Sequence, residues 1–91
     1  MHYFKYKNNT LFCEGIKVAE ICSKFKTPFY LYSSNALIYN YKLLQKRLDG
    51  INFLIAYSVK ANSNLSVLKT FAQCGAGADV VSVGELKKAL K

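Results

Sequence analysis

The sequence has no tryptophan and only one histidine, one proline and one arginine among its 91 residues. The histidine, His2, has no companions at a spacing that would complete a metal site. The three cysteines, Cys13, Cys22 and Cys74, form an odd set without C-x-x-C spacing, which argues against a disulfide framework or a zinc site. We therefore expect no metal, and three free thiols in a reducing compartment.

Long apolar runs are also missing. No segment reaches the roughly 18 consecutive apolar residues that a membrane-spanning helix needs. The first residues, Met1 to Lys7, are not followed by the apolar stretch of a secretory signal. These absences predict a cytoplasmic protein without a membrane partner.

Acidic residues are scarce: five, against 13 lysines and arginines, for a formal net charge of +8. Such a charge can indicate a nucleic-acid partner. The basic residues are scattered, however, with no run of three, and arginine, which most often reads bases, occurs once. We therefore expect no nucleic-acid partner and interpret the charge as a lysine-rich solvated surface, with a small basic interaction protein as an alternative.

Hydrophobic residues are abundant, at 52% of the chain, and no long polar or repetitive tract interrupts them. This composition predicts a globular fold rather than disorder. A chain of this length buries only about 60% of its unfolded surface, so it would be marginally stable alone.

Alternating and helical patterns predict the elements of the first third. Residues 3–13 are expected to form a hairpin that turns at Asn8-Asn9. Residues 18–25 have the apolar spacing of a short helix, which Thr27-Pro28 should end. Residues 29–32 then have the composition of a strand.

The remaining sequence alternates between helical and extended patterns. A helix is expected from a cap at Ser33 or Ser34 to about Leu48, closed by Asp49-Gly50. Further on we expect strands at 53–59 and 78–82, and helices after a cap at Ser63 or Asn64 and from Gly84 to Lys91. Strand, helix, strand in this order favours a right-handed parallel βαβ unit.

Lys60 directly follows the continuous apolar run 53–59. In parallel α/β folds, ligands bind at the carboxyl ends of strands. Partial desolvation there would disfavour the ammonium form and leave a neutral amine that can attack an aldehyde, as pyridoxal phosphate chemistry requires. By position alone, a solvated surface lysine is the commoner case.

A motif around this lysine makes the functional interpretation more specific. The segment Tyr57-Ser58-Val59-Lys60-Ala61-Asn62, followed by Val67-Leu68 and Gly75, resembles the pyridoxal phosphate attachment signature of the group IV decarboxylases. That family includes diaminopimelate, ornithine and arginine decarboxylases. Ser58 stands where Ala or Pro is usual and Phe71 where a smaller aliphatic is common; neither change affects the nucleophile.

Residues 75–86 resemble the diaminopimelate branch of that family, with Val83 in place of a usual glycine. Residues 27–33 resemble the approach to its first barrel helix. The resemblance implies an α/β fold, with the first βα units of a (β/α)8 pyridoxal-phosphate-binding barrel, incomplete here, plus an N-terminal strand segment of a β domain. Residues 1–32 would form that segment and the strand leading into the barrel, and residues 33–91 the start of the barrel.

The resemblance also implies an activity for the whole enzyme. That activity is the decarboxylation of meso-diaminopimelate, a small amino-acid substrate, to L-lysine by a homodimer in lysine biosynthesis. Lys60 would be the catalytic, cofactor-binding Schiff-base lysine, and Asp79, on the next strand, would lie beside it and the cofactor. A turn-associated Asp after Gly77 is the alternative for Asp79.

Other polar residues near the motif have plainer interpretations. Glu85 is expected to be a favourable acid in the first turn of a helix rather than a pocket residue. Tyr57 and Asn62 could contact the cofactor ring or order the loop, but such residues more often fill the core and form hydrogen bonds where a helix starts. Cys74 is expected to be a buried residue at a helix end.

The family's phosphate-binding loop, the acid that pairs with the pyridine nitrogen and the cross-dimer residues do not occur within these 91 residues. We therefore expect this piece alone to fold poorly and to be inactive, with Leu86 and Leu90 lacking packing partners. Two further alternatives stay open: an ornithine-, arginine- or carboxynorspermidine-type decarboxylase, and a non-catalytic barrel that carries pyridoxal phosphate.

Overall fold

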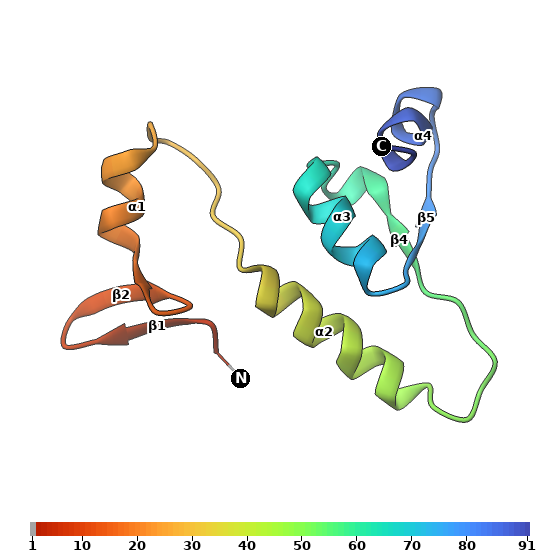
Figure 1. Cartoon of the computed structure of the whole chain (residues 1–91), viewed down its shortest axis with the longest axis horizontal. Coiled ribbons are helices and arrows are strands. Elements are labelled where there is room, and N and C mark those ends of the chain that lie inside the picture. Colours follow the sequence, from red (N-terminus) through yellow and green to blue (C-terminus); the bar gives the residue numbers. More distant parts are fainter. Residues whose placement is uncertain (1) are drawn as a thin grey trace. The chain divides into compact units, whose positions relative to one another are not determined.

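The computed structural model describes residues 2–91 (Figure 1). The chain consists of two compact units, Met1–Ala36 and Leu37–Lys91. The first contains a small antiparallel sheet and a short helix, and the second contains helices around two parallel strands. Of the helices formed by residues 2–91, none combines the length and the apolar character that crossing a bilayer requires.

The first unit begins with the predicted hairpin. Strand β1 (Phe4–Lys7) pairs antiparallel with β2 (Thr10–Cys13). Asn8 and Asn9 between them have φ angles of 52° and 61°. Two consecutive left-handed residues suit a tight hairpin turn, and asparagine tolerates this conformation better than most residues. A third strand, β3 (Ile16–Lys17), pairs with β2 and was not predicted.

Helix α1 (Val18–Lys24) follows β3 and agrees with the prediction for 18–25. It ends where Phe25 becomes extended, with the Phe25 N–H still donating to the Ile21 carbonyl at 3.1 Å. None of its residues is fully buried. The helix therefore covers the small sheet without creating a closed core.

The predicted strand at 29–32 is wrong, because this segment is irregular. Neither sheet in the described part of the chain includes it. A strand is stabilised by its ladder of backbone hydrogen bonds, and β-forming residues alone do not supply a partner. Tyr30 is 89% exposed, which shows how little of this segment is packed.

Helix α2 (Ser34–Arg47) begins and ends close to the predicted bounds. The buried Ser33 is its cap: the Ala36 N–H donates to Ser33 Oγ at 3.1 Å. Such a bond satisfies one of the amides that a helix start leaves unpaired. After the helix, Gly50 takes a φ of 84°, which a residue without a Cβ adopts readily.

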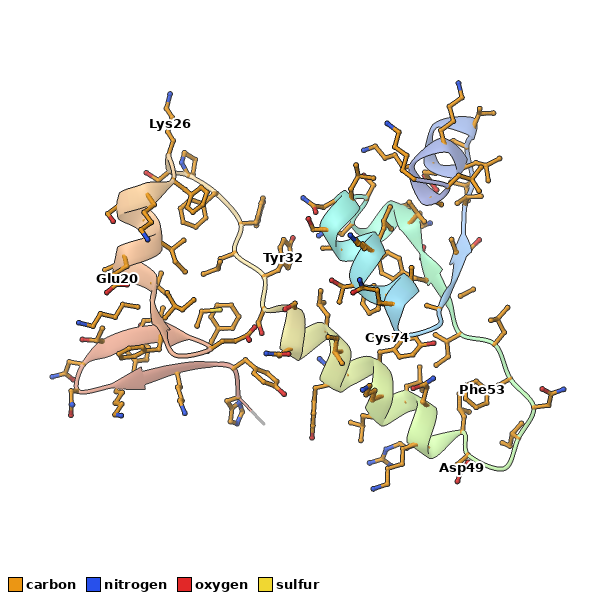
Figure 2. The ribbon with its side chains drawn as sticks, in the orientation of Figure 1. Glu20, Lys26, Tyr32, Asp49, Phe53 and Cys74 are labelled. Carbon is orange, nitrogen blue, oxygen red and sulfur yellow. The ribbon has the colours of Figure 1, made fainter. Side chains whose placement is uncertain are left out.

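The second unit contains the predicted parallel pair, β4 (Ala56–Ser58) and β5 (Gly77–Asp79). Both strands are shorter than the predicted runs 53–59 and 78–82. Each pairs with a single neighbour, so the residues beyond the pairing have no ladder to extend. Phe53, for example, lies in the irregular segment before β4 (Figure 2).

Two capped helices complete this unit. Helix α3 (Leu65–Gln73) connects β4 to β5 (Figure 1), as the βαβ prediction requires. Of the two caps that the sequence allowed, Ser63 and Asn64, the cap is Asn64, whose side chain accepts from the Ser66 N–H at 2.9 Å. Helix α4 (Val83–Ala89) starts one residue before the predicted Gly84.

Few side chains of the second unit are fully buried. Tyr41, Val59 and Val67 form its core, and Val59 has no exposed surface. Leu86 and Leu90 of the last helical region are 45% and 78% exposed, as expected for apolar residues without a packing partner. The unit thus presents apolar surface that its own residues do not cover.

Candidate functional site

Lys60 lies at the carboxyl end of β4, as predicted. It is the middle residue of η1, a 3-10 turn over Val59–Ala61 that follows the strand directly. The preceding Val59 is completely buried, whereas Lys60 is exposed. The turn is therefore anchored by an apolar side chain while its amine faces solvent. The partial desolvation expected for Lys60 does not arise from the residues described here.

Asp79 is the last residue of β5 and is also exposed. In the parallel register, Asp79 pairs with Ser58, two residues before Lys60. The carboxyl ends of parallel strands lie at the same edge of a sheet, so the amine and the carboxylate come from one edge. No ion pair joins the two side chains within residues 2–91. The structure thus brings both predicted site residues to one sheet edge, without direct contact.

The segment after Lys60 is ordered by hydrogen bonds. Tyr57 Oη donates to the Asn62 carbonyl at 2.9 Å, and the Asn64 N–H donates to Asn62 Oδ1 at 3.0 Å. With the Asn64 cap of α3, these bonds lead the chain from β4 into the helix. Tyr57 and Asn62 therefore have the structural roles expected of them.

Aromatic packing fixes β4 against α3. The Tyr57 ring stacks on Phe71 with centroids 4.6 Å apart, and the Tyr41 ring lies 6.2 Å from Phe71 at a tilted angle. Both separations lie in the range in which aromatic pairs attract each other. Phe71, one of the residues that departs from the family motif, thus lies at the centre of this cluster.

Glu85 belongs to the start of α4 rather than to the site. Its N–H donates to Ser82 Oγ at 3.1 Å, and its Oε1 accepts from the Val81 N–H at 3.0 Å. This pattern is close to a capping box, and Ser82-Val83-Gly84-Glu85 carries the S-x-x-E signature that could have predicted it. The preferred interpretation of Glu85 agrees with these contacts.

Cys74 is the C-terminal cap of α3 (Figure 2) and is half-buried, so it is more exposed than expected. Its N–H donates to the Phe71 carbonyl at 3.0 Å. All three cysteines are free thiols. Among residues 2–91, no group of three His, Cys, Asp or Glu side chains could hold a metal ion.

A polar cluster in the first unit was not predicted. Glu14 takes a φ of 53°, and its Oε2 accepts from Ser33 Oγ at 2.5 Å. The Asn35 backbone N–H donates to the same oxygen at 3.4 Å, and the Asn35 side-chain amide donates to Oε1. The bond from Ser33 is the main cause that lowers the pKa of Glu14 below its ordinary value; the Asn35 bonds act in the same direction and desolvation opposes them.

The pKa of the neighbouring Cys13 thiol is shifted in the opposite direction. Burial raises the pKa of the Cys13 thiol, and the charge of Glu14 adds to this effect. A thiol kept protonated is a poor nucleophile. Cys13 is therefore a packed residue of the sheet rather than a nucleophile.

A sequence profile of the pyridoxal-dependent decarboxylases, for their pyridoxal binding domain, matches residues 35–91. This match covers more than half of the chain. The fold, with its lysine after a strand of a parallel sheet, and this match define the class: the chain belongs to the pyridoxal-dependent decarboxylase family.

Individual relatives make the comparison more specific. Diaminopimelate decarboxylase of Pseudomonas fluorescens is 42% identical over 90 residues, which are 99% of this chain and 22% of that relative. A solved protein structure from Aquifex aeolicus is 41% identical with a TM-score of 0.90, over 97% of this chain and 21% of that one. Diaminopimelate decarboxylase of M. jannaschii in complex with L-lysine is 34% identical with a TM-score of 0.84, over 96% and 21%.

These similarities confirm the predicted fold class, an incomplete part of the pyridoxal-phosphate-binding barrel. They also confirm the resemblance to diaminopimelate decarboxylase. The chain spans about a fifth of the length of the curated relatives that it matches. The site described above therefore corresponds to one sheet edge within relatives that are much longer than this chain.

Proposed function

We propose that the full-length protein that contains these residues decarboxylates meso-diaminopimelate to L-lysine with pyridoxal phosphate, and that Lys60 binds the cofactor. The observation that supports this most directly is the position of Lys60. It is a primary amine on an anchored turn, at the carboxyl end of a parallel strand, in a chain of the pyridoxal-dependent decarboxylase family.

The residues at this edge suit the cofactor. The Lys60 amine is exposed, so an aldehyde can reach it, and the buried Val59 beside it fixes where the side chain starts. Lys60 would bind the cofactor aldehyde covalently through Nζ. When bound, pyridoxal phosphate supplies an electron-withdrawing ring that accepts the electrons of the breaking bond between Cα and the carboxylate.

Asp79 would act on the same amine electrostatically. A carboxylate at this edge favours the protonated form of a nitrogen nearby and orients it. Asp79 would therefore stabilise the protonated form of the lysine nitrogen once that nitrogen is bonded to the cofactor, whereas the attack on the aldehyde needs the neutral amine. Removal of the negative charge should weaken cofactor binding without displacing the attachment point.

The proposed partners and location are those that the sequence and its family resemblance predict. The substrate would be a small amino acid with two amino and two carboxylate groups, and the protein would act as a homodimer in the cytoplasm. Residues 1–32 would belong to a β domain and the strand leading into the barrel, and residues 33–91 to the barrel.

A substrate assay with a spectral readout tests this proposal on the full-length protein. We expect release of carbon dioxide and L-lysine from meso-diaminopimelate, and little turnover of ornithine or arginine. Lys60→Ala should abolish turnover and the visible absorbance of bound cofactor, whereas Lys69→Ala, at another exposed lysine, should preserve both. Preferred turnover of ornithine would overturn the substrate assignment, and cofactor absorbance unchanged in Lys60→Ala would overturn the role of Lys60.

A further inference from the structure

Helix α4 reaches back to the segment that follows Lys60. Lys88 Nζ donates to Ser63 Oγ at 3.3 Å, across 25 residues of sequence. The helix also contacts the turn η1 itself. No motif indicates this contact, because both residue types are common on protein surfaces.

The other hydrogen bonds that order this segment, among those described for residues 2–91, join it to the elements on either side of it. The β4 residue Tyr57 donates to the Asn62 carbonyl. The Asn62 and Asn64 side chains accept hydrogen bonds from backbone amides at the start of α3. Ser63, between these asparagines, is bonded by a residue from outside the β4–α3 connection. Lys88 therefore adds an attachment from a third element, α4.

This attachment is weak in energy but well placed. An exposed lysine–hydroxyl bond contributes little to the stability of the whole fold. Reaction rates respond more steeply, since a displacement of about 1 Å can cost about 10²-fold in rate. A small loss of order in residues 60–64 would thus affect the chemistry of Lys60 more than folding.

We propose that Lys88 is a positioning residue for the turn that carries Lys60, and that it acts through Ser63. The proposal rests on the proposed function, in which Lys60 binds the cofactor. The cationic side chain holds the Ser63 hydroxyl from α4 and so limits the positions available to the turn. Arginine at position 88 would preserve the donor, whereas methionine would keep a similar stem without it.

A double-mutant cycle in the full-length protein tests this. The variants are Lys88→Met, Ser63→Ala and the pair together. The readout is the rate at which pyridoxal phosphate becomes attached to Lys60, measured by borohydride reduction and peptide mapping at successive times. We expect each single variant to slow attachment by about threefold, the double variant to be no slower than the slower single one, and Lys88→Arg to restore most of the rate.

The matched control is Lys91→Met, which removes an exposed lysine just beyond the same helix and should leave the rate unchanged. Independent, multiplying effects of Lys88→Met and Ser63→Ala would overturn the proposal. So would an equal slowing by Lys91→Met, or a Lys88→Met variant that slows attachment only in proportion to a general loss of folded protein.

Failure of the proposed function would give a different result, namely no attachment at Lys60 in the unchanged protein. The ordering role of Lys88 is then tested by amide hydrogen exchange over residues 60–64. Faster exchange of these amides in Lys88→Met, with unchanged exchange in α2 and in Lys91→Met, would support it. Unchanged exchange over residues 60–64 would overturn it.

Discussion

At the scale of single residues, one carboxylate in the first unit accepts hydrogen bonds from several groups. Glu14 accepts from the Ser33 hydroxyl and from both amide groups of Asn35. It thus bonds to the cap and the first turn of α2, where the unpaired amides favour negative charge. These bonds lower the pKa of Glu14 and link this part of the fold to pH.

Glu14→Gln should loosen the start of α2 at neutral pH. Because the folded-state pKa is lowered, the carboxylate stabilises the fold fully above its unfolded pKa, about 4.3. That stabilisation is lost as the pH falls through the lower folded value. Amide exchange at Asn35 should therefore be faster in Glu14→Gln than in the unchanged protein at pH 7. The difference should shrink as the pH is lowered below the unfolded pKa, and a difference that grows in acid would contradict the assignment.

Asp79→Asn tests the second predicted site residue. Removing the charge at the sheet edge that carries Lys60 should weaken pyridoxal phosphate binding by about tenfold, or about 1.4 kcal/mol. The attachment should remain on Lys60. The control is Asp49→Asn, in the turn after α2, which should leave the affinity unchanged. Equal affinities of Asp79→Asn and the unchanged protein would show that Asp79 is only a strand-end residue.

At the scale of elements, β4 depends on aromatic packing against α3. Phe71→Ala should destabilise the protein by about 2–3 kcal/mol, less than for a fully buried ring because Phe71 is half-buried. Leu90→Ala, at a side chain that is 78% exposed, should change stability by less than about 0.5 kcal/mol. Urea unfolding of the full-length protein measures both. Equal effects would mean that the Tyr57–Phe71 stack contributes little.

Local signals predicted the helices better than the strands. The caps Ser33 and Asn64 mark the starts of α2 and α3, since capping depends on neighbouring residues alone. Strands depend on partners that the local sequence does not specify. The run 53–59 therefore pairs over only three residues, and the segment 29–32 forms no strand.

The two main residues of the candidate site were predictable from the sequence, but the long-range contacts were not. The apolar run before Lys60 predicted its position at the carboxyl end of a strand, whereas the position of Asp79 was predicted from the family resemblance; the parallel register brings both to one sheet edge. The contacts of Glu14 with Ser33 and of Lys88 with Ser63 join residues 19 and 25 positions apart. No local pattern encodes such pairs, because the folded chain alone brings them together.

At the scale of the whole molecule, each unit has very little buried interior. Cys13 and Ser33 are the buried side chains in the described part of the first unit, and Tyr41, Val59 and Val67 those of the second. Such small cores cannot offset the conformational entropy of about 90 ordered residues. In the relatives, which are about five times as long, more chain is available to cover the exposed apolar residues.

The 91 residues alone should therefore not unfold cooperatively. We expect differential scanning calorimetry to give a broad, shallow trace for this piece and a sharp transition for a full-length protein that includes it. A cooperative peak from the 91 residues would show that the two units stabilise themselves.

The most direct test of the central claim is to trap the cofactor on the full-length protein. Pyridoxal phosphate is added, the bond to the protein is reduced with borohydride, and the modified peptide is identified by mass spectrometry. The account predicts one modified residue, Lys60, at close to one cofactor per chain. Modification of a different lysine, or of none, would contradict it.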